Sequence, residues 1–230
     1  MKSPAKRKRS VKRRAVRIGR PPRELAGEVE TRILDAARQV FLERGLAGAS
    51  VDEIADFARA GKPTIYARFP SKEALFVAVM MRNVSEVMGA EIHVPAGADI
   101  EQRLISLGVT LAQGILASNT VGLMRLGISE ARRFPDLANY VHHMARERGV
   151  EAVARLLGEV AHSNDVGAMA AFAPEHLGTT SSFFLDLVLW PLLRRALFGE
   201  KLEQLLAELT PYMASRVAFF LAACRLGGVT

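Results

Sequence analysis

The stretch of sequence that decides the fold is SVDEIADFARAGKPTIYARFPSK, residues 50–72. It predicts two short helices joined by a tight turn at residues 59–61 and followed directly by the start of another helix. Ser50 is a favourable N-cap for the first helix, and Glu53, three residues later, completes the sequence pattern of a capping box. This layout is that of a helix-turn-helix, which presents one short helix to the major groove of DNA.

The second of these helices is predicted to run from Lys62 to Phe69. Pro63 is tolerated there because backbone N–H groups in the first turn have no partner inside the helix. Ile65 and Phe69 lie four residues apart and are expected to pack inward. Ser71 is the expected N-cap of the helix that follows.

The polar side chains of this segment fall on its outer side. Thr64 and Arg68 are four residues apart and share one face of the helix. Lys62, Tyr66 and Lys72 flank that face. Hydroxyl and cationic groups near helix N-termini suit phosphate oxygens, while Arg68 could contact guanine and the Thr64 methyl group could contact thymine. Taken alone, Arg68 is better explained as a solvated surface charge, whereas the whole set of residues favours DNA binding.

These residues resemble the N-terminal domain of the TetR family of bacterial transcriptional regulators over about residues 28–88. The resemblance rests on Ile54-Ala55, Ala58, Thr64-Ile65-Tyr66, Phe69 and the run Ser71-Lys72-Glu73-Ala74-Leu75-Phe76. It implies DNA contacts at Lys62, Pro63, Thr64, Tyr66, Arg68 and Lys72, and we add Ser50 as a further candidate. The chain departs from the family pattern at Arg59, where Gly is usual, at Gly61, where Ser is usual, and at Ala67-Arg68, where an aromatic residue and a His are common.

The N-terminal tail is a separate signal. Residues 1–20 contain ten Lys or Arg and no acid, whereas the rest of the chain carries 21 basic against 24 acidic residues. Residues 1–23 are therefore expected to form a disordered basic tail. The segment from Arg17 to Pro21 resembles the Gly-Arg-Pro core of minor-groove arms, which makes Arg17 and Arg20 candidates for contact with a narrow A·T-rich groove. Non-specific attraction to phosphate, which any ten cations would give, is favoured over this specific contact.

The remainder of the chain reads as helical, so the predicted fold class is all-α. A three-helix helix-turn-helix DNA-binding domain is expected over residues 24–89, with the motif itself at about 51–70 and a helix end at Gly45. A larger helical domain is expected over residues 99–230. Its helices are predicted at about 99–118, 121–133, 136–162, 175–198 and 202–224. Asp99 with Gln102, and Thr120, are candidate caps, and Pro191 and Pro211 should kink or restart the helices that contain them.

Two helices near the C-terminus carry apolar stripes that suit a dimer. A two-fold four-helix interface would place one recognition helix on each half of a palindrome. The candidate interface residues are Phe184, Leu187, Val188, Met213, Val217 and Phe220. The alternative is that these stripes form the ordinary core of a monomer.

Two further stretches, ISEARRFPDL at residues 128–137 and LDLVLWPLLRRALFG at residues 185–199, resemble the C-terminal domain of the AefR-like branch of TetR regulators. This resemblance implies an effector pocket among the central helices. The candidate wall residues are Met124, Phe134, Met144, Met169, Phe172, Phe183 and Trp190. Met and aromatic residues at helical spacing can also be plain core, but an apolar lining would suit a hydrophobic effector.

Other classes of function find little support in the sequence. The five His residues have no metal-ligand spacing, and Cys224 is the single cysteine, so neither a metal site nor a disulfide is expected. No nucleophile motif or glycine-rich phosphate loop appears, so neither catalysis nor a cofactor is expected. The charged N-terminus has no apolar stretch behind it, and residues 104–124 read as a buried helix and a turn rather than a membrane span.

The sequence therefore predicts a cytoplasmic, nucleoid-associated, homodimeric regulator that binds a palindromic operator on double-stranded DNA. It is also expected to respond to a small hydrophobic molecule. Repression is expected over activation because occupancy alone can block a promoter. Two rivals stay open. One is a non-specific, nucleoid-type DNA-binding protein in which the tail dominates. The other is a helical ligand-binding protein whose basic tail contacts anionic membrane or RNA.

Overall fold

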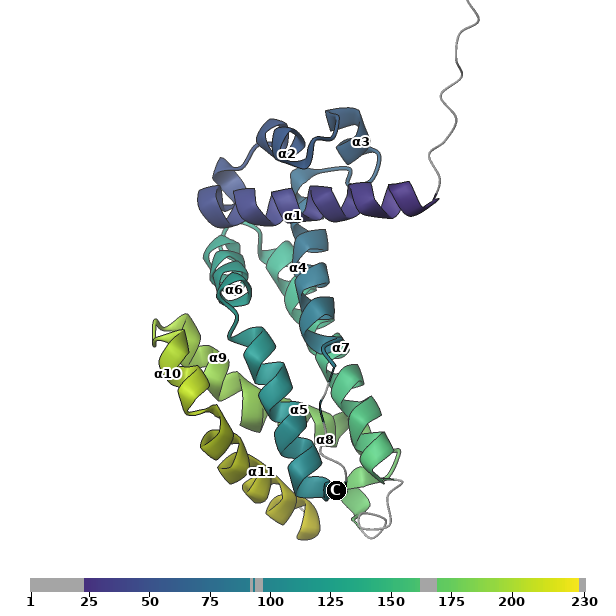
Figure 1. Ribbon diagram of the computed structural model, residues 1–230, viewed down its shortest axis with the longest axis vertical. Coiled ribbons are helices and arrows are strands. Elements are labelled where there is room, and N and C mark those ends of the chain that lie inside the picture. Colours follow the sequence, from purple (N-terminus) through teal and green to yellow (C-terminus); the bar gives the residue numbers. More distant parts are fainter. Residues whose placement is uncertain (1–22, 92, 94–96, 162–168, 228–230) are drawn as a thin grey trace, which may run out of the picture.

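The computed structural model describes residues 23–91, 93, 97–161 and 169–227, and every regular element within them is helical. The N-terminal elements are α1 (Arg23–Gly48), α2 (Val51–Ala58), α3 (Lys62–Tyr66) and α4 (Lys72–Met88). Helix α1 lies across one end of the molecule beside α2 and α3, and α4 leaves that end and descends into the larger helical body (Figure 1). The predicted all-α class is confirmed.

Side-chain caps set the boundaries of the N-terminal helices. The Ser50 Oγ atom accepts a hydrogen bond from the Glu53 N–H at 3.1 Å, and the Ser71 Oγ atom accepts one from the Ala74 N–H at 3.0 Å. The Glu53 side chain does not complete the predicted capping box, because it is turned toward Arg44 at 3.5 Å. Half of that motif is therefore enough to start α2.

The turn between α2 and α3 depends on an unusual backbone conformation at Arg59. Its φ and ψ of 49° and 45° lie in the left-handed region, which is energetically favourable only for glycine. This conformation lets the Arg59 N–H donate to the Asp56 carbonyl at 3.2 Å and the Ala60 N–H to the Ala55 carbonyl at 3.0 Å. The departure from the family pattern at Arg59 therefore leaves a normally shaped turn that carries local strain.

Helix α3 is shorter than predicted. It ends at Tyr66 rather than Phe69, and a short turn separates it from the cap at Ser71. Ile65 and Phe69 are nevertheless buried, as the spacing predicted.

The larger helical body contains the remaining elements. They are α5 (Ile100–Ile115), α6 (Ser118–Glu130), α7 (Pro135–Ala161), the 3-10 helix η1 (Ala170–Phe172), α8 (Leu177–Phe184), the π-helical segment η2 (Leu185–Leu189), α9 (Trp190–Leu197), α10 (Leu202–Ala207) and α11 (Leu209–Arg225). These elements follow the predicted ranges, with breaks inside the last two.

The breaks occur where proline removes a backbone donor. Pro191 lies in the first turn of α9, directly after η2, where the Trp190 N–H reaches back to the Leu185 carbonyl. Pro211 lies in the first turn of α11, after a break at Glu208. Both prolines therefore restart a helix, as predicted.

The predicted caps of the larger body had different outcomes. Asp99 and Gln102 form a full capping box at the start of α5. Thr120 does not cap α6, whose N-cap is Ala117, and the prediction was wrong there. Thr120 is instead buried, and its hydroxyl donates to the Asn83 Oδ1 atom at 3.2 Å.

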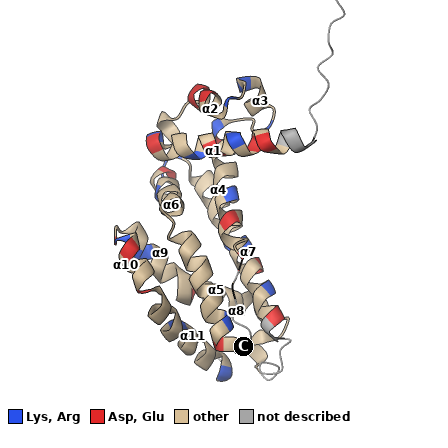
Figure 2. Ribbon diagram, in the orientation of Figure 1, with Lys and Arg blue, Asp and Glu red and all other residues tan. Residues whose placement is uncertain are grey.

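Two hydrophobic cores share helix α4. Its first half contributes Phe76, Val79 and Met80 to the core beneath α1–α3, while Val87 near its end belongs to the core of the larger body. Among the described residues no helix alone has the length and apolar character needed to cross a membrane, and α5 with α6 meets that test only as a pair bent by 65°. In Figure 2 charged residues recur along α1–α3, whereas most of α5 is uncharged.

The strain at Arg59 generates a stability prediction. Replacing Arg59 with Gly should raise the free energy of unfolding by about 0.5–1 kcal/mol, because Gly adopts the left-handed region without steric penalty. Urea denaturation followed by circular dichroism measures the change. The matched control is Arg32→Gly, at an exposed position inside α1, which should lower stability by about 1 kcal/mol. Equal destabilisation by both substitutions would contradict the account of this turn.

Candidate DNA-reading surface and effector cavity

Helix α3 presents an apolar side to the protein and a polar side to solvent. Ile65 is 1% exposed, whereas Lys62, Pro63 and Tyr66 are exposed and Thr64 is half-buried. The Tyr66 ring is 48% exposed although it is large and apolar. An exposed tyrosine between a cation and a hydroxyl is suited to contact a sugar-phosphate backbone.

Besides the Ser50 cap, three of the predicted DNA-contact side chains already have partners within the protein. The Lys62 ammonium pairs with the Asp52 carboxylate across the turn between α2 and α3. The Lys72 ammonium donates to the Ala49 carbonyl at 2.9 Å and to the Ala47 carbonyl at 3.3 Å, which fastens the start of α4 to the end of α1. No local pattern around Lys72 predicts this structural role.

Arg68 is the third of these side chains. Its guanidinium folds back along α3 and donates to the Thr64 carbonyl at 3.3 Å, and the residue is half-buried. A bidentate contact with guanine would require this side chain to swing outward. Ser50 is exposed at the N-terminus of α2, so its hydroxyl remains near any phosphate that approaches. Arg17 and Arg20 lie outside the described residues.

A cavity of about 550 Å³ lies in the larger body, against α4. Its wall is formed by side chains from α4, α5, α6, α7, η2 and α9, together with Phe134 from the loop before α7. The buried part of the wall includes Phe76, Met80, Asn83, Val87, Ile115, Thr120 and Leu193, and the exposed part includes Ile128, Asn139, His142, Arg146, Asp186 and Trp190. Its size is in the range that holds drug-sized ligands.

The predicted pocket residues separate into two groups. Met124, Phe134 and Trp190 line the cavity, whereas Met144, Met169, Phe172 and Phe183 do not. Phe172 is a core residue whose ring lies 6.5 Å from that of Phe220, and Phe183 is exposed on α8. The α4 side of the wall was not predicted, because the sequence pattern places this helix in the DNA-binding domain.

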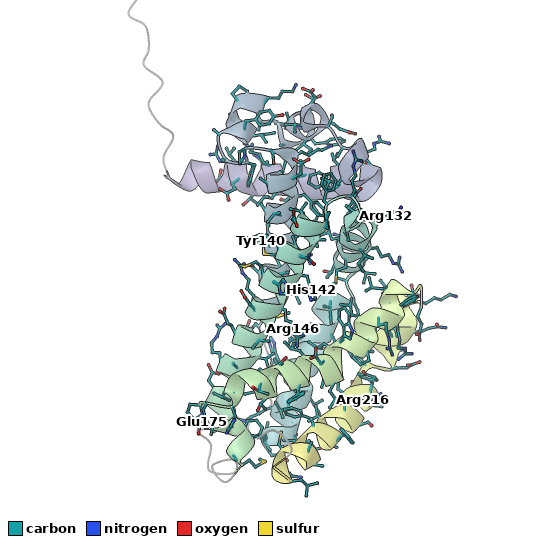
Figure 3. All side chains as sticks on the ribbon, turned by 180° about the vertical axis from the view of Figure 1, so that it is seen from behind. Arg132, Tyr140, His142, Arg146, Glu175 and Arg216 are labelled. Carbon is teal, nitrogen blue, oxygen red and sulfur yellow. The ribbon has the colours of Figure 1, made fainter. Side chains whose placement is uncertain are left out.

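The open side of the cavity carries an ion pair. Arg146 on α7 binds Asp186 on η2 through two hydrogen bonds of 2.8 Å, and it also donates to the Ser182 hydroxyl at 2.5 Å. The hydrogen bond from Arg146 lowers the pKa of the Asp186 carboxyl, which therefore stays ionised at neutral pH. Figure 3 shows His142 and Arg146 one turn apart on α7.

Most of the predicted dimer-interface residues lie inside the protomer rather than on its surface. Phe184, Val188, Met213, Val217 and Phe220 are fully or almost fully buried inside the chain, and Leu187 is half-buried. The rings of Phe184 and Phe220 are 5.3 Å apart in an edge-to-face contact. The five buried residues therefore form part of the protomer's own core, and their assignment to an interface was wrong, whereas the assignment of Leu187 stays a prediction.

The outer side of the same helices carries exposed aromatic side chains. Phe183 on α8 is 51% exposed and Phe219 on α11 is 66% exposed, and Phe198 after α9 is exposed as well. Phe183 and Phe219 directly precede Phe184 and Phe220, the buried residues that the sequence assigns to the interface. Within the described ranges no three His, Cys, Asp or Glu side chains lie close enough together to hold a metal ion.

Comparison with known families divides the chain into two matched regions. The model of the bacterial regulatory proteins of the tetR family matches residues 33–79, which contain α2, α3, most of α1 and the first part of α4. The model of the AefR-like transcriptional repressor C-terminal domain matches residues 102–225, which contain the cavity-lining helices from α5 onward.

Individual relatives agree with the family models. The HTH-type transcriptional activator FasR of Mycolicibacterium smegmatis is 40% identical over 89 residues, a match that spans 38% of this chain and 39% of FasR. A crystal structure assigned to a TetR-family transcriptional regulator from Mesorhizobium loti is 26% identical, with a TM-score of 0.72 over 86% of this chain and 97% of that one. The flavonoid-responsive regulator FrrA is 28% identical, with a TM-score of 0.62 over 86% of this chain and 97% of FrrA.

The match to FasR covers well under two thirds of that protein, whereas the two structures are covered almost completely. The family models, the helix-turn-helix geometry and the arrangement of the larger body all agree. The chain belongs to the TetR family of DNA-binding transcriptional regulators and has a C-terminal domain of the AefR-like type.

Proposed function

We propose that this chain is a cytoplasmic, ligand-responsive repressor that binds a palindromic operator as a homodimer. The operator would lie in the DNA of the nucleoid, with which the protein would therefore associate. The observation that carries the proposal is that one helix, α4, both follows the recognition helix and forms a wall of the cavity. A molecule in the cavity would therefore touch the same element that positions α3.

The DNA-reading step is assigned to the exposed side of α3. Tyr66 and Lys62 would contact the backbone, and Thr64 would face base edges in the major groove. Asp52 holds the Lys62 ammonium in place in the free protein, and a DNA phosphate would compete with that carboxylate. Lys72 would act mainly by holding α4 against α1, which keeps α3 at a fixed angle.

The dimer is assigned to the outer side of α8 and α11. Phe183 and Phe219 are large, exposed aromatic side chains on neighbouring helices, and aromatic residues are enriched in protein–protein interfaces. A two-fold dimer places two copies of α3 on one face of DNA, where successive major grooves are about 34–36 Å apart. Dimerisation through this surface leaves the cavity wall at α4 free to move.

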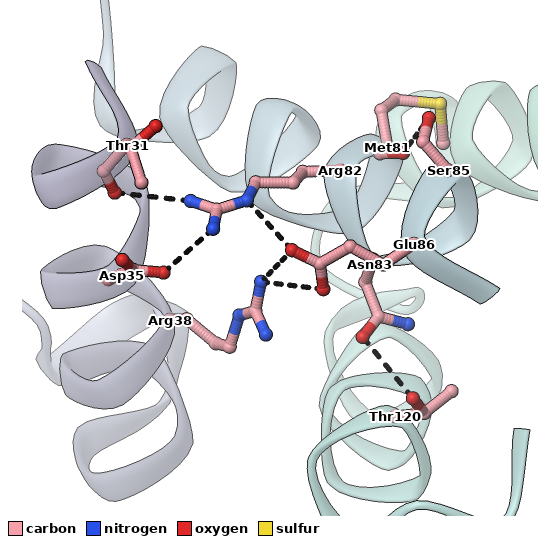
Figure 4. Close-up of polar contacts among 9 residues, drawn as sticks. All are labelled: Thr31, Asp35, Arg38, Met81, Arg82, Asn83, Ser85, Glu86 and Thr120. Carbon is pink, nitrogen blue, oxygen red and sulfur yellow. Dashed lines mark hydrogen bonds and ion pairs between the residues drawn. The ribbon is translucent and has the colours of Figure 1, made fainter. Parts of the chain in front are cut away.

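The link between the cavity and α1 is a network of charged side chains on α4 (Figure 4). Arg82 on α4 pairs with Asp35 on α1 at 3.0 Å, and Arg38 on α1 donates twice to Glu86 on α4 at 2.9 Å. Burial alone would raise the pKa of the Glu86 carboxyl, but hydrogen bonds and charges from Arg38 and Arg82 hold it below its ordinary value. The network thus stays charged at neutral pH and joins α1 to α4.

A ligand can shift this system only by its difference in affinity between the two conformations, typically about 1–3 kcal/mol of coupling. Repression is favoured because the C-terminal match is to a repressor domain and because occupancy of a promoter is sufficient for it. FasR is an activator, so the sign of regulation would depend on where the operator lies.

Selection of bound fragments from a random DNA pool at about 150 mM salt tests the proposed function, because non-specific phosphate attraction weakens steeply with salt. The full chain should enrich a palindrome, and Tyr66→Ala combined with Lys62→Ala should reduce affinity for it by at least tenfold. The control is Tyr140→Ala, an equally exposed tyrosine on α7, which should bind normally. Binding without enrichment would instead support the non-specific DNA-binding protein.

The dimer surface yields a separate prediction. Replacing Phe219 with Glu should convert a dimer to a monomer at micromolar concentration, because a carboxylate would be desolvated in the interface. Sedimentation velocity measures the change, and helical content should be unaffected because Phe219 is exposed. Tyr140→Glu supplies the control for an added surface charge. A Phe219→Glu protein that stays dimeric would place the interface elsewhere.

A further inference from the structure

Asn83 is a buried polar side chain that is only half satisfied by the protein. It lies on α4, is 7% exposed, and lines the cavity. Its Oδ1 atom accepts the hydrogen bond from Thr120, but its Nδ2 amide has no hydrogen-bond partner among the described residues (Figure 4). The Nδ2 atom is not fully buried, so it is open at the cavity wall and can donate to an acceptor that enters the cavity.

The surroundings of Asn83 are apolar and uncharged. Phe76, Met80 and Val87 come from its own helix, and Ile115 and Leu193 complete the buried part of the wall. An apolar cavity with a single free donor in the buried part of its wall favours ligands that fit its shape and carry one hydrogen-bond acceptor near that donor.

The charges of the cavity argue against an anion. Three charged residues line it, and two of them, Arg146 and Asp186, neutralise each other through their ion pair. The third, Glu130, carries a negative charge and has no ion pair within the described part of the chain. A carboxylate ligand would either compete with Asp186 for Arg146 or remain unpaired, and both outcomes are unfavourable.

We propose that the cavity binds a neutral, mainly apolar molecule that carries a hydrogen-bond acceptor, such as a ketone or ester oxygen, and that this oxygen accepts from the Asn83 Nδ2 amide. The regulatory consequence rests on the proposed function. Asn83 is three residues from Glu86 on α4. An acceptor bound to Asn83 therefore contacts the same turn of α4 that binds Arg38 on α1. The binding step itself does not depend on DNA.

Three linear probes that share a nine-carbon skeleton test the ligand class. They are 2-nonanone, which is neutral and has an acceptor, nonanoate, which is anionic, and nonylammonium, which is a cation without an acceptor. Isothermal titration on the full chain in the absence of DNA gives each affinity. Trp190 is the single tryptophan and lines the cavity, so its fluorescence reports whether the bound probe is there. The ketone should bind at least tenfold more tightly than either ion.

Substitution of Asn83 tests the donor. Asn83→Leu keeps the branched shape and removes the amide, so the affinity for 2-nonanone should fall about three- to tenfold. The control is Asn119→Leu, at an exposed position next to Thr120 and outside the cavity, which should leave affinity within twofold. If Asn83→Leu unfolds because the Thr120 hydroxyl is left unpaired, the double variant with Thr120→Val removes that hydroxyl as well.

Each other result would overturn the proposal. Tighter binding of nonanoate or nonylammonium would mean that the cavity selects a charged ligand. Equal affinity of the Asn83→Leu and wild-type proteins for 2-nonanone would show that the amide does not bind the ligand. If the fluorescence of Trp190 responded to none of the probes, the cavity would not be the binding site. If the protein binds 2-nonanone as predicted but enriches no palindrome, the proposed ligand class stands and the proposed DNA-binding function is contradicted.

Discussion

The structure depends on the fact that a single helix, α4, is packed into two hydrophobic cores at once. Phe76 and Met80 near its start belong to the core beneath α1–α3, and Val87 near its end belongs to the core of the larger body. Neither core can repack around α4 without affecting the other, because interiors packed at crystal-like density do not deform continuously. The orientation of the recognition helix is therefore set partly by side chains that line the cavity.

Polar contacts hold α4 to α1 at two separate places along α4. Lys72 holds the start of α4 to the end of α1 through two carbonyl groups, and the Arg38–Glu86 pair holds the two helices together about four turns further along α4. Asn83 and Glu86, one turn apart on α4, make contacts on different sides, with the cavity and with α1. A ligand that moves this turn must also move the contacts with α1, whereas surface ion pairs elsewhere contribute little.

Local sequence rules predicted the DNA-binding half well, because caps and turns depend on neighbouring residues. The roles of Ser50, Ser71 and Pro63 followed from backbone chemistry alone. The rest depended on tertiary packing: Phe184 and Phe183 are adjacent, and the sequence does not say which faces the chain's own core. Thr120 looked like a cap but bonds across helices to Asn83, a partner 37 residues away that no local pattern reveals.

The most direct test of the role of α4 is the distance between the two recognition helices in the dimer. A spin label at Ala67→Cys, just after α3, reports it by pulsed electron paramagnetic resonance, and burial raises the pKa of the native Cys224 thiol to about 11, which keeps it unreactive. The operator-bound dimer should give a distance near 34–36 Å, and saturating 2-nonanone should shift it. An unchanged distance with the ketone bound in the cavity would contradict transmission through α4.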